Sequence, residues 1–192
     1  MKHIRSSAAA FLAMGLSLPG CMTTTADTAM AGATVTVGGA PMYASRNIIQ
    51  NAVNSADHTT LVAAVKAAGL VDTLSGAGPF TVFAPTNAAF AKLPAGTVDT
   101  LLQPANRAML QSVLTYHVVP GRLTAADLMA RIRAGGGTAR LTTAQGGVLT
   151  ARMMGGRVML IDAKGGMSHV TQANVMQSNG VIHVTDAVSI PG

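Results

Sequence analysis

The spacing of apolar side chains changes half-way along the chain, and the change predicts where helices give way to strands. In the first half, apolar residues recur every three or four positions, as between Leu61 and Ala68, which gives a helix one buried face. Asp57 and Thr124 are the expected N-caps of two helices, Gly69 is an expected stop, and Met109 is expected to face inward. The pattern predicts helices near residues 48–53, 59–68, 88–93, 98–102, 104–114 and 124–132.

Short runs of alternating or β-branched residues predict the strands. Asn179-Gly180 is the strongest hairpin signal, because both residues tolerate positive φ. From Gly135 onward, glycine pairs separate runs of strand length, which indicates an antiparallel meander. The runs are residues 80–83 and 116–119 in the first half, then 138–143, 148–154, 157–162, 170–175 and 181–188. Helices first and strands last indicate an α+β domain.

The first residues have the pattern of an export signal. Two positive charges precede an apolar stretch from Ala8 to Leu18. This stretch is too short to span a membrane, since a transmembrane helix needs about 20 apolar residues. Leu18-Pro19-Gly20-Cys21 then resembles a bacterial lipobox, with Pro19 as its one departure. We therefore expect a lipoprotein signal peptide over residues 1–20 and lipidation of Cys21. The rival cleavage site is Ala29-Met30-Ala31, which would leave a secreted chain beginning at Gly32.

The remainder divides into two parts. Residues 21–43 are rich in Thr, Ala and Gly and are expected to form a flexible tether. Residues 44–191 are expected to form a single folded domain, because no internal repeat is visible. The predicted localisation is that of an outer-membrane or periplasmic-side lipoprotein, or otherwise of a secreted protein.

Composition narrows the class of partner. The chain carries a net charge of +6, has no Glu, and has only 3% aromatic residues. Its arginines are scattered, whereas nucleic-acid surfaces combine clustered basic residues with aromatics that stack on bases. No nucleic-acid partner is expected, and the arginines are interpreted as solvated charges.

Three segments resemble the fasciclin (FAS1) family. Residues 78–90 (GPFTVFAPTNAAF) and 179–186 (NGVIHVTD) resemble its two signature blocks, and residues 116–121 (YHVVPG) resemble its Tyr-His motif. The resemblance covers about residues 43–191. It implies the FAS1 fold, a wedge-shaped β-sandwich of two small sheets flanked by N-terminal helices. It also implies a bacterial secreted protein or lipoprotein that is non-catalytic and often adhesive.

The chain offers little material for catalysis. It has one Cys, and His58, His117, His169 and His183 form no recognised metal motif. The segment GMSHV around Ser168 approaches the G-x-S-x-G nucleophile pattern but lacks the last glycine. We expect no enzyme, no metal and no cofactor, and a hydrolase that uses Ser168 is the least favoured function.

Tyr116 and His117 are the candidate interaction motif. The resemblance implies a surface contact in adhesion, because such segments contact integrins in animal relatives. The opposing interpretation is a buried histidine bonded to backbone, which buried polar groups require.

Two functions therefore remain. The first is adhesion, or binding of a surface or matrix protein, by a monomer that contacts the membrane only through its lipid. The alternative is a carrier of an apolar, carotenoid- or lipid-like molecule, because Met suits adaptable apolar surfaces. The methionines that suggest such a groove are Met153, Met154, Met159, Met167 and Met176.

Overall fold

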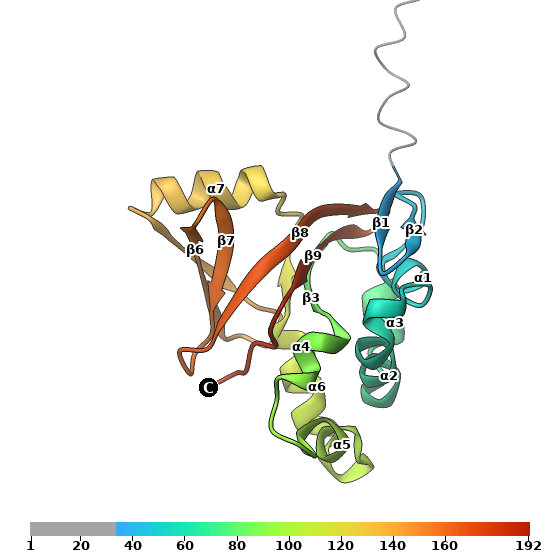
Figure 1. Cartoon of the computed structure of the whole chain (residues 1–192). Coiled ribbons are helices and arrows are strands. Elements are labelled where there is room, and N and C mark those ends of the chain that lie inside the picture. Colours follow the sequence, from blue (N-terminus) through green and yellow to red (C-terminus); the bar gives the residue numbers. More distant parts are fainter. Residues whose placement is uncertain (1–33) are drawn as a thin grey trace, which may run out of the picture.

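The computed structural model describes residues 34–192, which form seven α-helices and nine strands (Figure 1). The helices are α1 (Ile48–Ala52), α2 (Thr59–Ala68), α3 (Val71–Ser75), α4 (Asn87–Ala91), α5 (Thr97–Leu102), α6 (Arg107–Tyr116) and α7 (Ala125–Ala134). The strands are β1 (Val35–Val37), β2 (Ala40–Met42), β3 (Phe80–Pro85), β4 (Val118–Pro120), β5 (Thr138–Thr142), β6 (Val148–Met154), β7 (Arg157–Ile161), β8 (Met167–Gln177) and β9 (Gly180–Thr185). None of the helices in this part of the chain has the length and apolar content to span a lipid bilayer.

Seven of the strands form one sheet in the order β4-β3-β9-β8-β7-β6-β5. Its end strands approach each other, because the Ala144 amide after β5 donates to the Val118 oxygen of β4 at 2.7 Å. Strand β8 pairs with β7 through residues 167–169 and with β9 through residues 170–177, and two register shifts bend it in between. The α+β class is confirmed. The two small sheets that the fasciclin resemblance implied are the two halves of one bent sheet.

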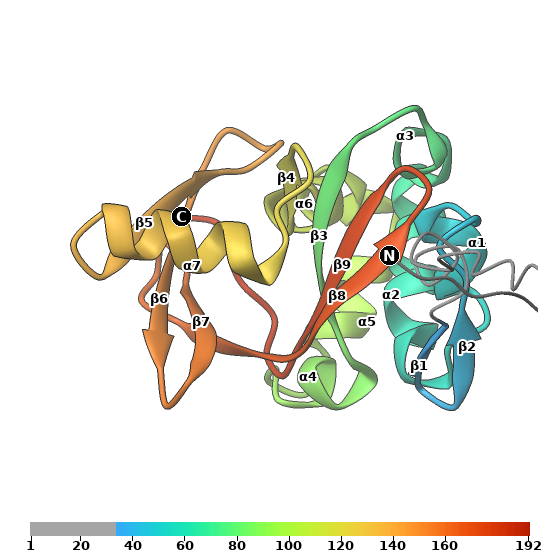
Figure 2. The ribbon, with the colours of Figure 1, turned by 90° about the horizontal axis from the view of Figure 1, so that it is seen from above.

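Strands β3 and β9 lie between two hydrophobic cores and supply side chains to both. They pair in parallel, a non-local pairing that the expected antiparallel meander did not include. Val82 and Ile182 point into the core formed with the N-terminal helices, whereas Phe83 packs in the core beneath α7. Figure 2 shows α7 over β6 and β7 at one end of the molecule, with α1–α3 at the other. The alternation of neighbouring residues between faces explains why β9 is buried along its whole length.

The end of the expected tether is part of the folded unit. Residues 35–42 form the β1–β2 hairpin, and its Val37 and Met42 are buried in the first core. A tether that reaches residue 43 is therefore wrong for residues 34–43. The remainder of the expected tether, the expected signal peptide and Cys21 lie outside the described residues.

Two of the helix caps and stops that the sequence predicted are confirmed. Gly69 ends α2 with φ 70°, and the Thr124 hydroxyl caps α7 in a capping box. Asp57 is not the cap of α2; instead the Asn87 side chain, from the start of α4, accepts the Thr60 amide at 3.0 Å. Inward packing of Met109 is also wrong, since this side chain is 60% exposed on α6.

The turn between β8 and β9 lies at the predicted residues, but positive φ is not its cause. Neither Asn179 nor Gly180 has positive φ. The Asn179 side chain accepts the Ile48 amide at 3.0 Å and donates to the Leu74 and Gly76 oxygens at 2.8 and 2.9 Å. Gly180 lies against β3, where an added Cβ would be 2.1 Å from the Phe80 oxygen.

Candidate functional site

Tyr116, the first residue of the expected interaction motif, is completely buried at the end of α6. Its hydroxyl donates to the Val148 oxygen at 2.7 Å and accepts the Ala163 amide at 3.1 Å. Burial raises the pKa of this phenol above its ordinary value. The side chain therefore joins α6 to the start of β6 and to the loop after β7.

His117 is buried beside it and uses both ring nitrogens inside the protein. Nδ1 donates to the Val113 oxygen at 2.8 Å, and Nε2 accepts the Ser189 amide at 2.9 Å. This pair of bonds requires the neutral ring with its proton on Nδ1. Burial lowers the pKa of His117, which favours the same neutral form.

His183, in the second signature block, has the same kind of environment. Its Nε2 donates to the Leu123 oxygen at 2.7 Å, Nδ1 accepts the Asn174 amide at 3.4 Å, and the ring stacks on Phe83. Burial lowers the pKa of this ring as well. The family motifs thus hold strands and loops together from inside, and the surface-contact interpretation of Tyr116 and His117 is wrong in this structure.

Ser168, the residue considered for hydrolysis, and the neighbouring His169 lie on opposite sides of β8. Ser168 is buried and faces Ser189, with their hydroxyl oxygens 3.5 Å apart. His169 is the next residue of the strand, so its ring takes the outer face, where Nδ1 is 3.5 Å from Asp186 Oδ2. The structure therefore does not pair Ser168 with His169 as nucleophile and base. Among residues 34–192, no three His, Cys, Asp or Glu side chains cluster as metal ligands would.

An apolar cleft lies among the N-terminal helices and has a volume of about 40 Å³. Residues from β1, β2, α1, α2 and β3 line it, and they include Met42 and His58. Sites that bury a small-molecule ligand are commonly about 300–1,000 Å³. The methionines of the strand-rich half are not in its lining, so the expected groove lined by them is absent from this cleft.

Exposed polar residues cover much of the outer face of β5, β6 and β7. The inner face of these strands packs against α7 through residues such as Leu141 and Leu149. On the outer face Arg140, Arg152 and Arg157 are exposed. These arginines are scattered along the sequence, and their proximity follows only from the pairing of the strands. The alternation of Thr and Arg with apolar residues in 138–142 was the signal in the sequence for an exposed strand face.

The match to a family model decides the identity of the domain: residues 56–191 match the model of the fasciclin domain. The chain belongs to the fasciclin family. Protein sll1483 of Synechocystis is 48% identical over 75% of this chain and 73% of its own length. Immunogenic protein MPB70 of Mycobacterium bovis is 39% identical over 73% of this chain and 66% of its own.

Two further fasciclin proteins bear on fold and location. Cell surface glycolipoprotein MPB83 of Mycobacterium bovis is 40% identical over 64% of this chain and 48% of its own length. A solved FAS1 domain pair from the insect cell adhesion molecule Fasciclin I superposes with a TM-score of 0.66 at 20% identity. The match covers 74% of this chain and 50% of the insect chain, and it establishes the FAS1 fold.

Proposed function

We propose that this chain is a non-catalytic binding protein of the bacterial envelope, which attaches cells to a surface or matrix component. The observation that carries the proposal is the use of the fasciclin motifs. Tyr116, His117 and His183 are all bonded within the domain, so the signature residues support a scaffold and leave recognition to its exposed faces. MPB83, a cell surface glycolipoprotein, and Fasciclin I, a cell adhesion molecule, support the same class of function.

The proposal includes a lipid anchor at Cys21. Bacterial lipoproteins carry several acyl chains, and more than one chain is needed for stable anchoring, since each buried methylene contributes about 0.8 kcal/mol. Cys21→Ala should move the protein from the membrane fraction to the soluble fraction. Mass spectrometry of the wild-type protein should show a lipid-modified N-terminal cysteine, whereas a mature chain beginning at Gly32 would refute the anchor.

Adhesion is tested in cells. A strain that lacks this protein should attach less to surfaces and should aggregate less, and the wild-type chain should restore both properties. Complementation with Cys21→Ala separates anchoring from binding, because the released protein should fail to restore attachment. Unchanged attachment and aggregation in the deletion strain would contradict the proposal.

A carrier of an apolar small molecule is the second candidate, and the apolar cleft is the observation in its favour. Because the cleft measures about 40 Å³, a carotenoid-sized ligand would require the N-terminal helices to separate. Organic extraction of protein purified from its native membrane tests this candidate directly. A colourless extract with no stoichiometric lipid would exclude it.

A further inference from the structure

Three arginines form a diagonal row across the outer face of the sheet. In the strand register, Arg140 of β5 is opposite Thr150, and Arg152 lies two residues further along β6. Arg152 is opposite Met159, and Arg157 lies two residues before it on β7. Diagonal neighbours of this kind are about 7–8 Å apart, within reach of long side chains. The row therefore presents three guanidinium groups to one side of the molecule.

These arginines have no acidic partner in the part of the chain that the structure describes. The ion pairs there join Asp186 to Lys92 and to His169, and none involves Arg140, Arg152 or Arg157. Residues 122–192 contain seven basic and three acidic residues, a net charge of +4, whereas residues 34–121 contain four and three, a net charge of +1. The strand-rich half is thus the positive end of the domain.

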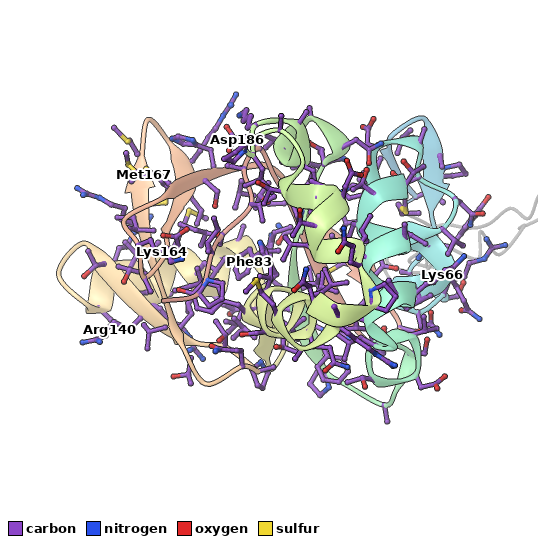
Figure 3. The ribbon with its side chains drawn as sticks, turned by 90° about the horizontal axis from the view of Figure 1, so that it is seen from below. Lys66, Phe83, Arg140, Lys164, Met167 and Asp186 are labelled. Atoms are coloured by element: carbon purple, nitrogen blue, oxygen red, sulfur yellow. The ribbon has the colours of Figure 1, made fainter. Side chains whose placement is uncertain are left out.

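The positive surface continues around the edge of the sheet. Arg140 also lines an open hollow of about 440 Å³ together with Arg131, at the end of α7. Figure 3 shows Arg140, Lys164 and Met167 at the end of the molecule opposite Lys66. Strand β1 lies at that opposite end as well (Figures 1 and 2). The arginine row therefore lies far from the point where the described chain begins.

Polar groups between the arginines complete the face. Thr138 and Thr150 are cross-strand neighbours of Arg152 and Arg140, so hydroxyl groups alternate with guanidinium groups. Met159 is opposite Arg152 and is only 2% exposed, so neighbouring side chains cover it and it adds no apolar surface to the face. A ligand that carries regularly spaced anions and many hydroxyls would be complementary to this arrangement.

We propose that the outer face of β5–β7 binds an acidic polysaccharide, with Arg140, Arg152 and Arg157 each contacting a carboxylate or sulfate group. The guanidinium group matches the planar geometry of such anions and binds them through two hydrogen bonds. Repeated anions on one polymer engage successive arginines at high effective concentration. This inference rests on the proposed binding function and names the chemistry of its partner.

Two other polyanions fit the face less well. Single-stranded nucleic acids are bound with aromatic side chains that stack on bases, and the outer residues of β5–β7 include no Phe, Tyr or Trp. Surfaces that insert into membranes usually present Trp, Phe or Leu beside their basic residues. Here the exposed apolar residues at this end are Met154 and Met167.

Binding of defined polymers by the full chain in detergent tests the proposal. The wild-type protein should bind dextran sulfate and polygalacturonate, more weakly as salt rises, and should not bind neutral dextran. The triple variant Arg140→Gln, Arg152→Gln and Arg157→Gln should bind both acidic polymers about 10- to 100-fold more weakly, because three charge-assisted contacts are lost.

A matched triple variant controls for net charge. Arg46→Gln, Lys66→Gln and Arg107→Gln remove the same charge from the helical end and should keep affinity within about twofold. Circular dichroism and thermal melting should show that both triple variants fold. Equal losses in the two variants, or no binding of either acidic polymer by the wild type, would overturn the proposal.

Two further probes distinguish the competing partners. Single-stranded DNA or phosphatidylglycerol vesicles that bind more tightly than the polysaccharides, through the same three arginines, would also overturn it. Failure of the proposed adhesion function has a different signature. In that case the deletion strain attaches normally, while the purified chain still binds acidic polysaccharide through the arginine row.

Discussion

Replacement of Tyr116 by Phe tests whether the Tyr-His motif is structural. The substitution keeps the ring and its packing but removes the hydroxyl. The Val148 oxygen then loses its donor at 2.7 Å, and the Ala163 amide loses its acceptor at 3.1 Å. Tyr116 is 0% exposed, but Val148 is half-buried and Ala163 is exposed, so water can partly replace the hydroxyl at these two backbone groups. The change therefore isolates two hydrogen bonds from other effects.

The expected magnitude follows from the loss of two hydrogen bonds. Both hydrogen bonds are partly buried, and a hydrogen bond of this kind contributes about 0.5–1.5 kcal/mol net, so we expect a loss of about 1–2 kcal/mol. For a domain of this size, 1 kcal/mol corresponds to about 2–4 °C in Tm. Tyr116→Phe should therefore lower Tm by about 2–8 °C.

Urea unfolding followed by circular dichroism measures the change in free energy, and Tyr43→Phe is a matched control. Tyr43 is the other tyrosine of the chain, is 39% exposed, and lies against the Arg46 guanidinium. Its hydroxyl makes no hydrogen bond within residues 34–192, so its loss should change stability by less than about 0.5 kcal/mol.

Equal destabilisation by Tyr116→Phe and Tyr43→Phe would contradict a structural role for the Tyr116 hydroxyl. Binding data add a second criterion, because a structural residue should leave the polysaccharide affinity of the folded protein unchanged. A variant of full stability that loses partner binding would restore the contact interpretation of Tyr116.

Three other changes test the internal bonds. Burial lowers the pKa of His117 and His183, so below pH about 6.5 the unfolded chain takes up protons before the folded chain does. The free energy of unfolding should therefore be highest above pH about 6.5 and should fall below it, and a urea midpoint that is constant from about pH 7 to 5 would contradict this. Gly180→Ala places a Cβ 2.1 Å from a backbone oxygen of β3 and should destabilise the fold more than the control Gly155→Ala does. Gly155 has φ 57° and free space around it, so its replacement should lower the free energy of unfolding by about 1–2 kcal/mol; equal urea midpoints for the two variants would contradict the close approach at Gly180. Asn179→Ala removes three bonds to backbone groups and should cost about 2–4 kcal/mol in urea unfolding, and a loss below about 0.5 kcal/mol would show that water replaces them.

Helix and strand signals were reliable where their physical cause is local. The cap at Thr124 and the stop at Gly69 depend on hydrogen bonds or φ angles within one turn of helix, and both were predicted. The cap of α2 was missed because its acceptor, Asn87, is 27 residues from the Thr60 amide. The β1–β2 hairpin was missed for the same reason, since Val37 and Met42 are stabilised by a core built from distant helices.

Periodicity, turns and caps act over a few residues, so the α+β class, the fasciclin motifs and most element positions could be predicted from the sequence. Which polar residues are internal and which meet on the surface depends on tertiary contacts. Tyr116 and His117 are buried because β6 and the C-terminal segment supply their partners. Arg140 and Arg152 are neighbours because the β5–β6 register places them diagonally. Both outcomes depend on contacts between segments far apart in the chain, which no local pattern encodes.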